Sequence, residues 1–214
     1  MLIKIVIGGS FFTNCYIVGD EDTKEAILID PGAQVDDVLE VIRSNGLEVT
    51  RIINTHAHID HVSGVAKAKK ELSAEFYLHK DELPVLEDIP NAAMRFPEFA
   101  GTEVPEVEHF LEEGDEVAVG KYTAKVVHTP GHTPGHICLI FEGHVFDGDT
   151  LFAGSVGRVD LTGGSSMEEL VNSIKTKLLT LPPDYRVYSG HGPITTIDIE
   201  KRTNPFLMEG LLHY

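Results

Sequence analysis

The sequence predicts an α/β fold in which two β-sheets pack face to face and helices cover their outer faces. Short apolar runs alternate with amphipathic segments along the whole chain. The order of strands, helix, strand and helix occurs twice, so the chain divides into two similar halves. Residues able to bind a ligand follow one predicted strand after another, which is where an α/β sandwich places its site.

The first half contains the clearest elements. Residues 34–45 carry apolar side chains at helical spacing, and Gly46 follows as a typical helix stop. A second helix is expected after the histidine-rich loop, ending near residue 72. Strands are expected at residues 2–7, 14–18, 26–29, 51–54 and 76–78.

In the second half, residues 80–110 are rich in Pro and Glu, and we expect an insertion or lid that contains a little helix. A long Gly-rich loop is expected at 147–164. Helices are expected from Ser165 or Ser166 to residue 178 and near 198–202, before an apolar tail at 206–214. Strands are expected at residues 116–119, 122–127, 137–141, 145–146 and 186–188.

Length and charge narrow the class of protein. With 214 residues, 42% of them hydrophobic, we expect a single domain over residues 1–214. The formal net charge of −17 repels phosphate backbones and anionic lipid, so we expect no nucleic-acid and no membrane partner. The first apolar run is too short for a signal peptide, and no run approaches a membrane span, which predicts a cytoplasmic location. Cys15 and Cys138 are expected to be small buried side chains within strands.

Three histidines and an aspartate lie within six positions directly after a predicted buried strand. Side chains two apart on an extended chain point the same way, so His56 and His58 can bind one ion. Asp60 and His61 are offset from that pair and can serve a second ion nearby. Solvated or core histidines are the alternative interpretation, but this spacing makes it improbable.

Three further candidates lie in the second half of the chain. His132 follows the rigid turn Pro130-Gly131, and His191 stands between two glycines at the end of a predicted strand. Asp149 follows another strand, and one carboxylate can bridge two cations. We therefore predict His56, His58 and His132 for one ion, Asp60, His61 and His191 for the other, and Asp149 between them.

Mixed imidazole and carboxylate ligands suit two divalent transition-metal ions, with Zn first and Fe or Mn as alternatives. The set contains no thiolate, which argues against a closed structural zinc site. The remaining histidines are expected to be structural or at the surface: His79, His109, His128, His136, His144 and His213.

The run Thr-His-Ala-His-Ile-Asp-His at 55–61 resembles the hallmark of the metallo-β-lactamase superfamily. The other ligand positions follow in the superfamily's order, and the resemblance extends over residues 3–191. It implies an αββα sandwich of two mixed sheets, with Asp30 supporting the ligands rather than binding metal. Residues 148–161 are most similar to the glyoxalase II branch of thioester hydrolases. The short segment after His191 differs from the helical C-terminal domain of typical glyoxalase II enzymes, so we expect no such domain and a weaker grip on glutathione.

This resemblance implies hydrolysis of an S-2-hydroxyacylglutathione to glutathione and a 2-hydroxy acid. Two cations that share a water lower its pKa to about 7, and the bridging hydroxide attacks the thioester carbonyl. Asp60 would bind metal and orient that nucleophile. Arg158, in the loop after Asp149, is the best candidate to meet an anionic small-molecule substrate, although a salt bridge bracing the loop is an equal alternative. The acyl group, the thiol carrier and the oligomeric state remain open.

Three other functions compete with this interpretation. A persulfide dioxygenase resembles the chain closely and uses one iron at the positions of His56, His132 and Asp149. A nuclease of the superfamily would need a basic surface, which the net charge opposes. A metal-binding module without catalysis would hold ions only for stability, and unlike an enzyme it needs no open coordination position.

Overall fold

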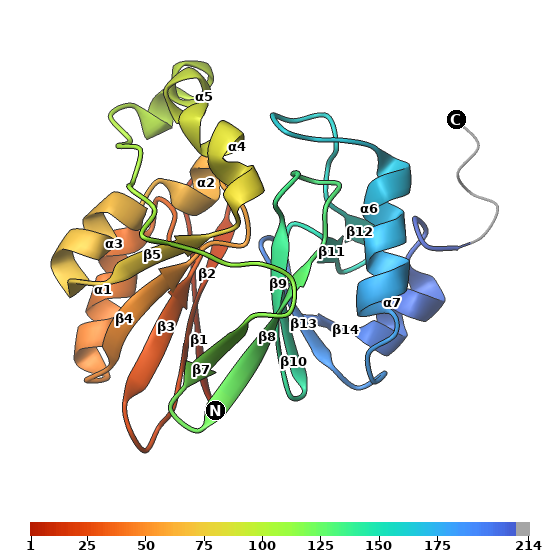
Figure 1. The fold of residues 1–214 in the computed structure, drawn as a ribbon, viewed down its shortest axis with the longest axis horizontal. Coiled ribbons are helices and arrows are strands. Elements are labelled where there is room, and N and C mark those ends of the chain that lie inside the picture. The colour runs from red at the N-terminus through yellow and green to blue at the C-terminus, as the bar shows by residue number, and fades with distance from the viewer. Residues whose placement is uncertain (209–214) are drawn as a thin grey trace.

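Two six-stranded sheets pack face to face between two outer layers of helices (Figure 1). This computed structural model describes residues 1–208. The predicted αββα sandwich of two mixed sheets is therefore confirmed.

The first sheet has the order β1-β2-β3-β4-β5-β6. Pairs β1–β2 and β2–β3 are antiparallel, whereas β3–β4, β4–β5 and β5–β6 are parallel. Parallel neighbours bring their carboxyl ends to one edge, where the loops after β3 and β4 emerge together. Its strands are β1 (Leu2–Gly8), β2 (Thr13–Gly19), β3 (Glu25–Ile29), β4 (Glu48–Ile53), β5 (Glu75–Leu78) and β6 (His109–Phe110).

The second sheet has the order β14-β13-β10-β9-β8-β7. Only β10 and β13 pair in parallel, with Val145 opposite Val187 in register. The ends of β10 and β13 therefore also lie side by side. Its strands are β7 (Glu116–Val119), β8 (Tyr122–His128), β9 (Ile137–Phe141), β10 (His144–Gly148), β13 (Arg186–Ser189) and β14 (Thr195–Thr196).

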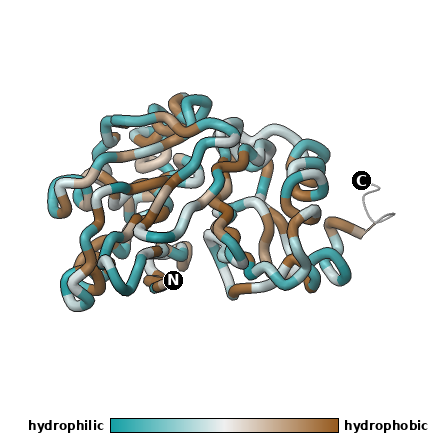
Figure 2. Tube along the Cα trace, turned by 60° about the horizontal axis from the view of Figure 1, so that its bottom comes forward, coloured by the Kyte–Doolittle hydropathy of each residue, from teal (hydrophilic) through white to brown (hydrophobic). Residues whose placement is uncertain are grey.

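Alternation along β2 explains how three layers of core arise. Cys15 and Ile17 pack against the helices of the first half, while Tyr16 and Val18 face the second sheet. Cys138 of β9 lies in the third core, beneath the helices of the second half. Both cysteines are buried and free. Figure 2 shows hydrophobic segments running through both halves, with hydrophilic turns at the outer edges.

Helices of the outer layers follow the sequence pattern closely. The predicted helix at 34–45 is α1 (Val35–Ser44), and its apolar stripe is buried. The serine cap predicted at 165 or 166 is Ser166, whose side chain accepts a hydrogen bond from the backbone N–H of Glu169. The helical elements nearby are α2 (Ile59–Val62), α3 (Val65–Leu72), α6 (Met167–Ser173) with its π-helical extension η3 (Ile174–Leu178), and α7 (Ile197–Thr203).

Two predicted loops contain more structure than expected. The insertion at 80–110 holds η1 (Lys80–Glu82), α4 (Leu83–Glu87), α5 (Ile89–Arg95) and η2 (Pro97–Phe99). The Gly-rich loop contains a small hairpin, β11 (Leu151–Phe152) with β12 (Ser155–Val156). Of the tail expected at 206–214, residues 209–214 lie outside the described part of the chain. Within residues 1–208, no helix has the length and apolar character that crossing a bilayer requires.

Candidate metal centre

Loops from both sheets meet at one end of the sandwich. The seven predicted ligands follow β4, β8, β10 and β13, so they converge although 135 positions separate the first from the last. Asn14 holds the two sheets together beside them: its backbone N–H donates to Gly190 O at 2.7 Å, and its side-chain amide donates to Ser189 O at 2.9 Å. The site is therefore built on the seam between the sheets.

The backbone after β4 explains why neighbouring ligands point to different places. His58 is extended, at φ −63° and ψ 149°, and α2 begins at the next residue. His56 and His58 therefore leave an extended segment, while Asp60 and His61 leave the first turn of a helix. His56, His58 and His132 form a first cluster, whose ligand atoms lie within 4.8 Å of one another. Within it, His58 Nδ1 is 2.9 Å from His132 Nε2.

Hydrogen bonds on the side away from the cluster centre set the tautomers of His58 and His132. His132 Nδ1 donates to the carbonyl of Arg158 at 2.6 Å, and His58 Nε2 donates to the carbonyl of Thr162 at 2.9 Å. Because a carbonyl only accepts, the other ring nitrogen of each histidine presents a lone pair to the centre. His56 Nε2 is buried and has no hydrogen-bond partner. Burial and the neighbouring imidazoles lower the pKa of His58 to about 4 and hold the pKa of His56 well below its usual range, which keeps both rings neutral at pH 7.

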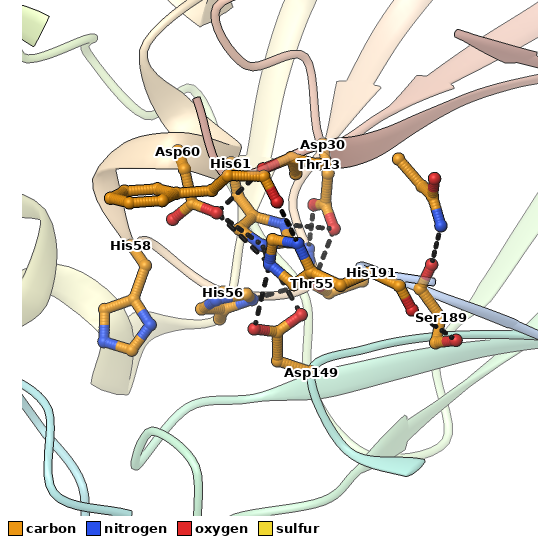
Figure 3. A network of polar contacts seen from close by, with 12 residues as sticks. Thr13, Asp30, Thr55, His56, His58, Asp60, His61, Asp149, Ser189 and His191 are labelled. Atoms are coloured by element: carbon orange, nitrogen blue, oxygen red, sulfur yellow. Dashed lines mark hydrogen bonds and ion pairs between the residues drawn. The ribbon is translucent and has the colours of Figure 1, made fainter. Parts of the chain in front are cut away.

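Asp60, His61 and His191 form a second cluster, whose ligand atoms also lie within 4.8 Å of one another (Figure 3). His61 Nε2 and His191 Nε2 lie 3.4 and 3.3 Å from Asp60 Oδ2. The opposite nitrogens are engaged outward, since His191 Nδ1 donates to Phe11 O at 3.0 Å. Thr13 Oγ1 donates to Asp60 Oδ2 at 2.8 Å and holds that carboxylate in place.

Asp149 joins the two clusters. Its Oδ2 lies 3.6 Å from His132 Nε2 and 3.5 Å from His191 Nε2, and its Oδ1 lies 3.4 Å from His61 Nε2. Only glycine fits at position 190, because a Cβ there would lie 2.2 Å from Asp149 Oδ1. The structure thus places Asp149 between the two clusters, within 3.6 Å of ring nitrogens from both.

Two carboxylates, those of Asp60 and Asp149, dominate the electrostatics of the second cluster. Although burial disfavours its charged form, the carboxylates of Asp60 and Asp149 raise the pKa of His61 to about 9. Burial also opposes the charge on His191, but hydrogen bonds to the same two carboxylates raise its pKa to about 11. Burial would raise the pKa of Asp60, yet His61 lowers it to about 2. Without a metal ion, protonated His61 and His191 balance the two carboxylates. A divalent cation would supply that positive charge instead and leave both imidazoles neutral, which is the form that binds metal.

The spacing of donor atoms fits transition-metal ions. Two donors that each lie about 2.1 Å from one tetrahedral ion are about 3.4 Å apart. The imidazole–carboxylate separations in the second cluster and around Asp149 are 3.3–3.6 Å. Two buried atoms facing the centre, His56 Nε2 and Asp149 Oδ1, have no hydrogen-bond partner. The residues present therefore fit divalent ions in both clusters.

Asp30 supports the centre from the end of β3. It has a left-handed backbone, at φ 52°, and is buried. Its carboxylate accepts hydrogen bonds from the backbone N–H of Thr55 at 2.8 Å, from the Thr55 hydroxyl at 2.7 Å and from His61 Nδ1 at 3.1 Å. With its oxygens engaged in this way, Asp30 orients His61 rather than offering a free ligand atom.

Glu82 is a functional candidate that sequence reasoning missed. It is buried, and its two carboxylate oxygens accept hydrogen bonds from the backbone N–H groups of Ala57 and Gly135, each at 2.8 Å. Glu82 therefore ties the loop of His56 and His58 to the loop of His132. Burial raises its pKa to about 7, against the lowering effect of these bonds. Its position in a Pro- and Glu-rich insertion gave no sign of this role.

Within residues 1–208, the histidines not predicted as ligands have other partners, and His213 lies outside the described residues. His136 Nε2 accepts a hydrogen bond from the backbone N–H of Asp149 at 3.1 Å, which positions that residue. His79, Asp81 and His128 form a further group of potential ligand atoms within 4.8 Å. However, His79 and His128 stack with their ring planes 6° apart, and His79 Nδ1 already accepts from the backbone N–H of Asp81. We therefore assign this group a structural role.

A cavity of about 640 Å³ opens above both clusters. Arg158 lines it, but its guanidinium donates to both carboxylate oxygens of Asp160, at 2.9 and 2.8 Å. About two thirds of each of these two side chains is exposed. The structure thus shows the loop-bracing salt bridge at Arg158, one of the two roles expected for this residue.

Comparisons with known proteins agree with this geometry. The family model of the metallo-β-lactamase superfamily matches residues 8–191. The hydroxyacylglutathione hydrolase GloC of Haemophilus influenzae is 37% identical over 217 residues, which cover 97% of this chain and 98% of GloC. The B3 metallo-β-lactamase BLEG-1 aligns with a TM-score of 0.89 and 37% identity, over 96% of this chain and 99% of BLEG-1. TTHA1623 in a di-iron-bound form aligns with a TM-score of 0.86 and 40% identity, over 95% of this chain and 100% of its own.

Proposed function

The chain belongs to the metallo-β-lactamase superfamily, and we propose that it is a dinuclear metal-dependent hydrolase that cleaves acyl thioesters of the glyoxalase II type. The observation that carries the proposal is the pair of three-ligand clusters joined by Asp149. The likeness to a hydroxyacylglutathione hydrolase over nearly the full length of both chains supports the thioester class. The substrate would be a small-molecule S-2-hydroxyacylglutathione or a related thioester.

Two divalent ions would share the site. One would be held by His56, His58 and His132, and the other by Asp60, His61 and His191, with Asp149 contributing to both. The donor set suits Zn, and also Fe or Mn. The di-iron-bound form of TTHA1623, which is 40% identical, supports a two-ion site and makes iron a serious alternative to zinc.

When bound, such ions supply hydroxide at neutral pH and polarise a carbonyl oxygen. The chain's own residues position the reactants for this chemistry. Asp60, held by the Thr13 hydroxyl at the edge of the cavity, accepts a hydrogen bond from the attacking water and orients it toward the carbonyl carbon. A thioester suits this arrangement because its thiolate leaves without prior protonation, so the reaction needs no separate general acid.

Three observations favour this function over its rivals. A mononuclear persulfide dioxygenase would use His56, His132 and Asp149, but here Asp60, His61 and His191 form a second set of matching geometry. A module that holds ions only for stability needs no substrate space, whereas a cavity of about 640 Å³ borders both clusters. The net charge of −17 disfavours a nucleic-acid substrate.

Metal analysis coupled to activity assays tests the proposal. We expect about two ions per chain in fully active protein, hydrolysis of S-lactoylglutathione, loss of activity on chelation, and its return with Zn, Fe or Mn. Glutathione persulfide with oxygen electrode detection, and a chromogenic cephalosporin, are run in parallel. Oxygen uptake without thioester cleavage would establish the dioxygenase, and full activity with one ion per chain would overturn the dinuclear site.

A further inference from the structure

The cavity above the metal centre has two different surfaces. Its floor consists of ligand side chains, including His58, His132 and Asp149. Its walls are largely apolar and come from separate parts of the chain. They include Phe11 before β2, Ile89 and Phe96 of the insertion, and Phe152 and Leu161 after β10.

The insertion wall is fixed to the metal centre. Arg95 at the end of α5 donates to Asp88 Oδ2 at 2.9 Å and to Thr162 Oγ1 at 3.1 Å, and the Thr162 hydroxyl donates to Asp88 at 3.1 Å. The carbonyl of the same Thr162 accepts a hydrogen bond from His58 Nε2 at 2.9 Å. One residue thus connects α5 to a ligand of the first cluster, so the apolar wall stands at a set position beside the reacting centre.

Aromatic packing gives the wall its shape. The ring of Phe11 meets that of Phe96 edge to face, with centroids 5.2 Å apart, and lies 5.7 Å from that of Phe99. Phe99 is buried, while Phe11 keeps 37% of its surface exposed and faces the cavity. The wall is therefore present before substrate arrives, and an apolar group entering it loses water without reordering the protein.

Apart from the ions proposed for its floor, the cavity offers no unpaired cationic side chain to an anionic group among the described residues. Arg95 is paired with Asp88, and Arg158 is paired with Asp160 through two hydrogen bonds. These are the arginines among the described residues that line the cavity, and lysine is absent from that lining. A substrate carboxylate would have to displace one of these aspartates, whereas an apolar group meets a matching surface without such a cost.

We propose that this wall binds the acyl part of the substrate, so that the enzyme prefers thioesters whose acyl group carries an aromatic ring or a chain of about six carbons. This inference rests on the proposed thioester hydrolysis and adds its substrate class. Water adds to the thioester carbonyl, the carbon–sulfur bond breaks, and the products are the carboxylic acid and the free thiol. Recognition of the acyl group, rather than of the charged ends of the carrier, sets the specificity.

A matched pair of substrates tests the preference. S-Lactoylglutathione and S-mandeloylglutathione share the carrier and the 2-hydroxyacyl group, and differ in a methyl against a phenyl group. Burial of one methylene corresponds to a factor of about three to four in binding, so a partly buried phenyl group should raise kcat/KM by about tenfold or more. Hexanoyl and acetyl thioesters of N-acetylcysteamine, an uncharged carrier, should show the same order.

Substitutions of wall residues test whether the apolar wall causes the preference for larger acyl groups. Phe96→Ala should reduce the mandeloyl preference about fivefold or more, while the lactoyl substrate changes less than about twofold. Leu161→Ala, on a separate segment of the wall, provides a second variant should the first fold poorly. Phe110→Ala is the matched control, because Phe110 is an exposed aromatic of β6 that does not line the cavity.

The possible outcomes separate the two proposals. If fully metallated protein hydrolyses both thioesters with equal efficiency, the inference fails and the proposed function stands. If it hydrolyses neither the glutathione nor the N-acetylcysteamine thioesters, both the proposed function and the inference that rests on it are wrong. A preference that survives both Phe96→Ala and Leu161→Ala unchanged would also overturn the inference.

Discussion

The two ligand clusters differ in how they balance charge. The first consists of three imidazoles with lowered pKa values, which are neutral at pH 7 and present lone pairs to one point. The second contains the Asp60 carboxylate, and without a cation its histidines have pKa values raised to about 9 and 11. The first cluster therefore offers ready ligands, whereas the second offers a strong negative field. The first ion would therefore be held mainly by the lone pairs of neutral imidazoles, and the second mainly by the negative charge of carboxylates.

The hydrogen bonds that hold the ligand side chains in place also differ between the two clusters. His58 and His132 donate to backbone carbonyls of one loop, and Glu82 ties their own loops together. The second cluster relies mainly on side chains, because Thr13 holds Asp60 and Asp30 holds His61, while His191 donates to the backbone carbonyl of Phe11. Asp149 is common to both clusters. Substitutions can therefore be chosen to damage one cluster, the other or both.

Asp149→Ala should have the largest effect, because it removes the carboxylate that we propose both ions share. We expect both ions to bind weakly and kcat to fall by far more than the 10- to 100-fold typical of residues that only support ligands. Metal analysis after gel filtration, with steady-state kinetics, measures both quantities. Asp149→Asn keeps the shape and serves as the matched control for packing. Two tightly bound ions with normal turnover would show that this carboxylate is not a shared ligand.

His58→Ala and His191→Ala should separate the clusters. Each removes one imidazole, so we expect about a hundredfold weaker binding of one ion and less than tenfold weaker binding of the other. Because ligand loss acts on affinity, excess metal should partly restore the activity of His191→Ala. Titration of the metal-free proteins with Zn, followed calorimetrically, resolves the two events. Equal loss of both ions in both variants would mean that the clusters act as one unit.

Glu82→Gln should have a smaller effect, directed at the first cluster. A glutamine side chain has one acceptor oxygen, so its amide group must face one of the N–H groups of Ala57 and Gly135. We expect a loss of about 1–3 kcal/mol in the free energy of unfolding and about 10- to 100-fold weaker metal binding at the first cluster. Glu87→Gln, on the exposed side of α4, is the control. Unchanged metal affinity in Glu82→Gln would show that Glu82 does not support the metal ligands.

Glu82 also predicts a pH dependence of stability. Its folded pKa of about 7 lies above the ordinary value of 4.5, so ionisation favours the unfolded state. The stability of the native protein relative to Glu82→Gln is therefore greatest at acid pH and declines as the pH rises through 7. Between pH 5 and pH 8 the decline should be on the order of 2–3 kcal/mol. Denaturant titrations of the two metal-free proteins measure it, and a difference that does not vary with pH would contradict the assignment.

Local spacing in the sequence determined the fold class and the candidate ligands. The histidine run at 55–61 follows a strand and starts a helix, and both features are set by neighbouring residues. For that reason the pairing of His56 with His58, and of Asp60 with His61, could be predicted before any long-range contact was known. The helix at 34–45 and its apolar stripe followed in the same way from periodicity.

Other features were decided by tertiary structure alone. Glu82 reaches loops 25 and 53 positions away, and nothing adjacent to it indicates a buried carboxylate. Arg158 pairs with Asp160 only two positions along, but whether its guanidinium stays in that salt bridge or meets a substrate depends on where the fold places this loop beside the cavity. The apolar wall unites Phe11, Phe96 and Leu161, which lie on three separate segments. Local spacing predicts what a residue's neighbours impose on it, but hydrogen bonds and packing between distant segments depend on how the two sheets meet, and only the folded chain decides that.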